Sequence, residues 1–157
     1  MSLTVKKASV RGPATWFISG GREIYRLLDN PVLCMEIVRG KKRFQMELSF
    51  KKGFTYDGVS RPAIAKNYIL KFDPDNKLYN FAAAAHDWLY AVKGNGMFNR
   101  SECDDVLRGI FREAGLSRFK AGLMDWCVGV FAGGRKHWGN DSFGIRDLVE
   151  CTAVVSM

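Results

Sequence analysis

Three absences narrow the class of protein before any motif is considered. None of the four cysteines belongs to a C-x-x-C pair, so a zinc knuckle is not expected. No apolar run approaches the roughly 18 residues that a membrane-spanning helix needs. The N-terminal residues include no apolar stretch of the kind found in secretory signals. We therefore expect a soluble protein with reduced thiols, without a membrane span or a secretion signal.

The composition favours one folded, basic domain. A chain of 157 residues fits a single domain, residues 1–157, and we find no linker or repeat that would divide it. The 47% hydrophobic and 13% aromatic content supports a real core and argues against disorder. Lys and Arg outnumber Asp and Glu by 24 to 16, which gives a net charge of +8. Such a surface favours nucleic acid, anionic lipid or an acidic protein as partner.

A β-hairpin is predicted over residues 32–50. Val32 to Val38 is rich in apolar and β-branched residues, and Gly40-Lys41-Lys42 marks a turn. Beyond the turn, apolar and polar residues alternate strictly, which is typical of a half-buried strand; the apolar set is Phe44, Met46, Leu48 and Phe50. Basic residues gather around the hairpin ends: Arg39, Lys41, Lys42, Arg43, Lys51 and Lys52. They form either a binding patch or an ordinary solvated surface, and we favour the second.

Helices are predicted in the second half of the chain. The run from Asn80 to Val92 carries four successive alanines and ends at Gly94-Asn95-Gly96. A second helix starts near Asn99 or Ser101 and stops at Gly115, and a third runs from near Ser117 to about Ala132. A short helix is expected at residues 145–151. In the first 30 residues, 15–18 indicate a short strand and 23–28 a short helical or strand segment. The predicted fold is α+β: an N-terminal β-hairpin or small antiparallel sheet packed on three C-terminal helices.

The helix over residues 80–92 carries an unusual polar pair. His86 and Tyr90 share one helix face, whereas the neighbouring Asp87 points about 100° away. The short Gly-rich connection makes this helix antiparallel to the next, which brings Asp104 within reach of His86. A carboxylate on one histidine nitrogen makes the other more basic, so His86 would be a general base, with Tyr90 hydrogen-bonded to Asp104. Asp87 could ligate a hard cation together with Asp57 or loop carbonyls, whereas the alternative for Asp57 is that it only caps its own turn. The structural alternative is a buried histidine satisfied by its partners.

These motifs resemble the core of the secretory phospholipases of the A2 class. The resemblance rests on His86-Asp87-x-x-Tyr90 and on Cys103-Asp104 in the following antiparallel helix. It implies that His86 is the base, that Asp87 binds calcium and that Asp104 orients His86. The paired cysteines that precede the His-Asp pair in that family are replaced here by alanines, and its calcium loop is absent, so Asp57-Gly58 would have to substitute.

A longer stretch is similar to a family of phage and prophage proteins known as a domain of unknown function, the DUF1353 family. The similarity rests on Gly53-Phe-Thr-x-Asp-Gly-x-Ser-x-Pro62, on Ala-x-x-His-Asp-Trp-Leu-Tyr90 and on Arg100-x-x-x-Asp104. It implies a bacteriophage origin and leaves the chemistry open.

Three functions fit these features. A phage-encoded hydrolase acting on an ester or related bond predicts a cleft over His86 and a cation by Asp87. A non-enzymatic virion protein, such as a tail or baseplate component, predicts that His86 is covered. A nucleic-acid-associated protein ranks last, because the basic residues are scattered rather than aligned. We expect a phage-encoded, virion-associated protein with a phospholipase-like hydrolase site, in the virion or host cytoplasm. Its expected partners are other phage structural proteins or membrane lipid. The alternative is a purely structural virion protein.

Overall fold

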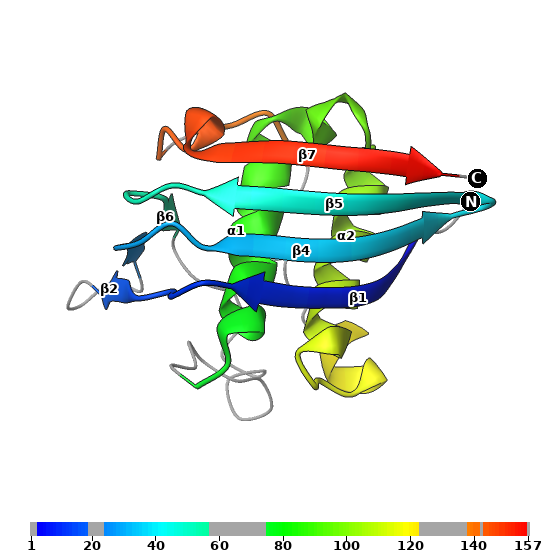
Figure 1. Cartoon of the computed structure of the whole chain (residues 1–157), viewed down its shortest axis with the longest axis horizontal. Coiled ribbons are helices and arrows are strands. Elements are labelled where there is room, and N and C mark those ends of the chain that lie inside the picture. The colour runs from blue at the N-terminus through cyan, green and yellow to red at the C-terminus, as the bar shows by residue number, and fades with distance from the viewer. Residues whose placement is uncertain (1–2, 19–23, 57–74, 123–137, 142, 157) are drawn as a thin grey trace.

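The computed structural model describes residues 3–18, 24–56, 75–122, 138–141 and 143–156, and it shows an antiparallel sheet with helices behind one face (Figure 1). The main sheet, in spatial order, consists of β1 (Leu3–Arg11), β4 (Val32–Arg39), β5 (Lys42–Phe50) and β7 (Val149–Ser156). A smaller antiparallel sheet consists of β2 (Trp16–Ile18), β3 (Tyr25–Leu27) and β6 (Thr55–Tyr56). The helices are α1 (Lys77–Ala91) and α2 (Arg100–Glu113), joined by the 3-10 turn η2 (Lys93–Gly96).

The hairpin of β4 and β5 confirms the period-two prediction. Its register runs unbroken from Val32 opposite Ser49 to Arg39 opposite Lys42. The two-residue turn begins at Gly40, whose φ of 61° is a conformation that glycine adopts without steric cost. The alternating apolar side chains are all buried: Leu33, Met35, Ile37, Phe44, Met46, Leu48 and Phe50. They form the sheet side of the core, against which the helices pack.

The opposite face of the main sheet carries ion pairs between its strands. Arg43 donates to Glu36 at 2.6 Å, and Arg11 lies 3.4 Å from Glu47. Exposed pairs of this kind contribute at most about 1 kcal/mol each, since water and salt screen them. One covered and one solvated face is the usual arrangement for an antiparallel sheet.

Capping interactions fix both ends of the helix pair. At the start of α1, the Asn76 side chain accepts from Tyr79 N, and its amide donates to the Ala114 carbonyl at the end of α2. At the start of α2, Asn99 and Glu102 form a reciprocal capping box. The Asn76–Ala114 contact joins the start of α1 to the end of α2, as an antiparallel arrangement requires. α2 also lies very close to β1, because a Cβ at Gly109 would stand 2.6 Å from the Val5 side chain.

The structure confirms the α+β class and the first two predicted helices, and it corrects the arrangement of the sheet. The main sheet is not purely N-terminal, since β7 joins it after the helices. The helix expected at residues 145–151 is wrong beyond the 3-10 turn η3 (Arg146–Leu148), because β7 then pairs along the whole of β5. β1 was not predicted. The third helix begins as expected, with residues 118–122 helical and Ser117 Oγ accepting from Lys120 N. The rest of that prediction lies outside the described residues.

Candidate functional site

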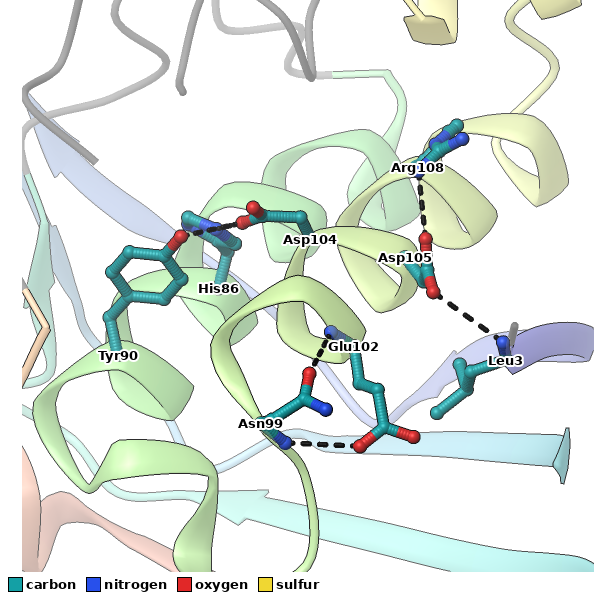
Figure 2. A network of polar contacts seen from close by, with 8 residues as sticks. All are labelled: Leu3, His86, Tyr90, Asn99, Glu102, Asp104, Asp105 and Arg108. Atoms are coloured by element: carbon teal, nitrogen blue, oxygen red, sulfur yellow. Dashed lines mark hydrogen bonds and ion pairs between the residues drawn. The ribbon is translucent and has the colours of Figure 1, made fainter. Parts of the chain in front are cut away.

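The predicted contact between α1 and α2 is present. His86 Nε2 lies 2.8 Å from Asp104 Oδ1, and the Tyr90 hydroxyl donates to the same oxygen at 2.7 Å (Figure 2). His86 and Tyr90 are one turn apart on α1, and Asp104 lies early in α2. The predicted meeting of these three side chains is therefore confirmed. The catalytic roles assigned to them remain predictions.

The turn between the helices sets this geometry. All four residues of η2 have positive φ: Lys93 51°, Gly94 72°, Asn95 55° and Gly96 72°. The two glycines adopt these angles freely, whereas Lys93 and Asn95 carry strain of about 1 kcal/mol or more each. A Cβ at Gly94 would lie 3.6 Å from both Cys103 Sγ and the Trp138 ring, so the turn is packed tightly against α2. This packing compensates for the strain and reverses the chain within a few residues.

The three side chains differ in exposure. His86 is only 5% exposed and Tyr90 is also buried, whereas the Asp104 side chain is 25% exposed. The His86 and Tyr90 rings are stacked at a tilt with centroids 4.2 Å apart, and Trp138 meets the Tyr90 ring edge-on at 5.2 Å. The imidazole is thus fixed in orientation by ring packing as well as by its hydrogen bond. Asp104 is the member of the trio that water reaches most easily.

Protonation at the site follows from these contacts. Burial, reinforced by the hydrogen bond to the Asp104 carboxylate, raises the pKa of Tyr90 well above its ordinary value of 10.0. Tyr90 therefore remains a hydroxyl donor at neutral pH, and the Asp104 oxygen is an acceptor. Since that oxygen also faces His86 Nε2, the imidazole must carry a proton on Nε2, which leaves the lone pair of neutral His86 on Nδ1. Burial likewise raises the pKa of the adjacent Cys103 to about 12.

The predicted metal ligands are only partly covered by the structure. Asp87 lies on α1 beside His86 and is partly buried, whereas Asp57 lies outside the described residues. In the described ranges, no three His, Cys, Asp or Glu side chains are grouped so that they could hold a metal ion. The calcium prediction therefore stays a prediction, and we assign no chemistry to a metal below.

Three acidic residues at the start of α2 contact three different elements, and Figure 2 shows the contacts of Asp104 and Asp105. Asp104 contacts α1, Glu102 forms an ion pair with Arg39 of β4 at 3.0 Å, and Asp105 accepts from Leu3 N of β1 at 3.4 Å. Sequence analysis identified Asp104 alone. The Arg39 and Trp138 contacts come from distant segments and have no local sequence signal.

Comparison with known protein families identifies the family of this chain. Residues 34–128 match the model of the family described as "Protein of unknown function (DUF1353)". Because the match covers more than half of the 157 residues, the chain belongs to this family. The matched region includes the hairpin, α1 and α2, and therefore all three residues of the polar site, whereas β1 and β7 lie outside it. No curated protein and no solved structure matches the chain.

Two further observations bear on the predicted setting. The described cysteines Cys34, Cys103 and Cys151 are free thiols. Among the helices in the described ranges, none is both long and apolar enough to cross a membrane.

Proposed function

We propose that this chain is a hydrolase in which His86 activates a water molecule for attack on an ester or related bond. The observation that carries the proposal is the shared Asp104 oxygen, which accepts from both His86 Nε2 and the Tyr90 hydroxyl. A hydrogen-bonded carboxylate that fixes a histidine tautomer is how a general base is oriented in many active sites. The same three residues carry the resemblance to secretory phospholipases, which favours a lipid ester as substrate.

In the proposed reaction, Nδ1 of neutral His86 accepts a proton from water while the water oxygen bonds to the ester carbonyl carbon. The carbonyl electron pair moves onto its oxygen, which gives a tetrahedral oxyanion and an imidazolium. When the oxyanion collapses, the bond to the leaving alkoxide breaks, and Nδ1–H returns the proton to that alkoxide. Throughout, the negative charge of Asp104 stabilises the imidazolium through Nε2–H. The products are a carboxylic acid and an alcohol.

A structural role is the second candidate, and the 5% exposure of His86 favours it. In this case the trio is a buried polar network that holds α1 and α2 in register, and the chain serves as a non-enzymatic component. Buried polar groups with all partners in place specify one packing arrangement, because any shift leaves a donor unsatisfied.

Asp104→Asn separates the two candidates. It preserves the side-chain shape but removes the charge that supports an imidazolium. For a hydrolase, turnover of a phospholipid or short-chain fatty ester should fall by roughly 10²–10⁴-fold with the melting temperature nearly unchanged. For a structural network, the free energy of unfolding should fall by about 1–3 kcal/mol, with no turnover in the parent protein to lose.

Asp105→Asn is the matched control, since Asp105 is the next residue on α2 but contacts β1 and Arg108 rather than His86. It should leave turnover unchanged. The hydrolase proposal is wrong if the parent protein is inactive on every ester tested and Asp104→Asn lowers the melting temperature. That outcome supports the structural network.

We further propose a phage origin and a place in the virion, as a tail or baseplate component. Membership of the family supports this through its resemblance to phage and prophage proteins, and other phage structural proteins or membrane lipid are the proposed partners. Peptide mass spectrometry of purified particles tests the location: peptides of this chain should be present at a stoichiometric level. Their absence from particles, with abundance in the infected cell, would place the protein in the host cytoplasm.

A further inference from the structure

The two edges of the main sheet are built differently. β1 has an irregularity in its register between Val5 and Lys7, with Lys6 and Lys7 exposed at that point, and such features hinder the addition of another strand. β7 pairs with β5 without a break in register. Its side chains are exposed from Thr152 to Ser156, including Val154 at 70% and Val155 at 51%. A regular, exposed, apolar edge is a site where a further strand can add.

The backbone groups on this edge can be assigned from the ladder. Lys51 N donates to the Leu148 carbonyl, which fixes that pair as hydrogen-bonded, just before the strand begins. Antiparallel ladders alternate between hydrogen-bonded and non-hydrogen-bonded pairs. The even-numbered residues of β7 therefore bond to β5, and the odd-numbered ones direct N–H and C=O away from β5, to a side where the described residues form no further strand. These outward residues are Val149, Cys151, Ala153 and Val155.

We propose that β7 pairs antiparallel with β7 of a second copy, across a two-fold axis at Ala153, so that the two main sheets join into one. The odd-numbered backbone groups of both copies meet in this register, which an antiparallel pair requires. Thr152 then faces the partner's Val154, which is also exposed on the same face. Eight residues of regular strand with a single charge are suited to such a pairing.

The position of that charge selects the antiparallel arrangement. Glu150 is the charged residue of β7, and it lies near one end of the strand. In a parallel pair the two Glu150 carboxylates would lie side by side and repel each other. In the proposed pair, Glu150 faces the partner's Ser156, which is itself next to the partner's Arg43 on β5. Each Glu150 therefore approaches a cation of the other copy.

Ala153→Pro tests the pairing. Proline removes the Ala153 N–H, which points away from β5, so the fold should be retained while the new ladder loses its central bonds. Light scattering of the full chain over a concentration series should show a dimer for the parent protein and a monomer for Ala153→Pro. The matched control Ala153→Ser keeps the N–H and should stay dimeric. A parent protein that is monomeric throughout, or larger than a dimer, overturns the proposal, as does a folded Ala153→Pro dimer.

Two other substitutions test the proposed pairing if the Ala153→Pro variant does not fold. Val154→Lys places a charge on the solvated face of the edge, opposite the partner's Thr152, and leaves the β5 ladder intact, so it should weaken the dimer. A Val154→Lys dimer as tight as the parent contradicts the pairing. Glu150→Lys reverses the charge at both Glu150–Arg43 contacts of the dimer, so it should weaken the dimer by up to about thirtyfold. Adding Arg43→Glu in the same chain should restore it. Weakening without restoration would contradict the register.

Discussion

Two carboxylates at the start of α2 hold this helix in place through different chemistry. Glu102 meets Arg39, whose guanidinium can only donate hydrogen bonds. Asp104 meets His86 and Tyr90, whose imidazole and hydroxyl can each donate or accept a hydrogen bond. The two contacts have similar lengths, 3.0 Å and 2.8 Å, and lie within one turn of each other. Length therefore does not distinguish a fixed structural pair from a pair able to do proton chemistry; the identity of the donors does.

Both carboxylate oxygens of Glu102 accept hydrogen bonds, and Arg39 has further partners besides Glu102. One carboxylate oxygen accepts from Asn99 N and the other from Arg39. Arg39 also donates to the Met97 carbonyl at 2.9 Å, and its guanidinium lies over the rings of Phe44 and Phe98. These contacts join β4 to the start of α2 and leave little room for a ligand. We therefore interpret this contact as purely structural.

The largest expected effect is on this structural pair. Glu102→Ala removes the partner of a mostly buried guanidinium and half of the capping box, and it should lower the free energy of unfolding by about 3 kcal/mol. Urea denaturation measures the loss. Glu47→Ala, which breaks the exposed pair with Arg11, is the control and should cost less than about 1 kcal/mol. Equal losses in the two variants would show that the Arg39–Glu102 pair stabilises the fold no more than the exposed Arg11–Glu47 pair does.

Local signals predicted the helix pair well and the sheet only in part. Four alanines, the Asn99 cap and the glycine-rich turn specify α1 and α2 directly from neighbouring residues. The Asp104 contact then follows from antiparallel geometry. β7 has only a weak signal, because the alternation of apolar and polar residues lasts from Val149 to Ala153 and is broken by Val154 and Val155. The pairing of Arg39 with Glu102 spans 63 residues and depends on the final packing, so no local pattern reveals it.

Alkaline pH should destabilise the fold through two buried groups next to Asp104, the Tyr90 hydroxyl and the Cys103 thiol. The pKa of Cys103 is raised to about 12 from 9.0, and the pKa of Tyr90 is raised above 10.0, both chiefly by burial. The unfolded chain then loses these protons first as pH rises. Their contribution to stability is complete below about pH 9 and is lost above it, at up to about 1.4 kcal/mol per pH unit for each group.

Urea unfolding between pH 8 and 11 tests this slope. The Cys103→Ala and Tyr90→Phe double variant should have a shallower decline than the parent, whereas Glu102→Ala should lower the whole curve without changing its slope. An unchanged slope in the double variant would show that neither group is linked to folding in this range.

The smallest expected effect is that of Tyr90→Phe alone. Phenylalanine keeps the ring contacts with His86 and Trp138 but removes one donor to Asp104, whose side chain is 25% exposed and can accept from water instead. We expect a loss of about 1 kcal/mol in the free energy of unfolding. Because Asp104 still holds Nε2 of His86, turnover should fall less than in Asp104→Asn. Adding Tyr90→Phe to Asp104→Asn should cost less than the two single losses combined, since both changes disrupt one network. Tyr90→Phe turnover as low as that of Asp104→Asn, at full stability, would instead give the hydroxyl a direct part in the reaction.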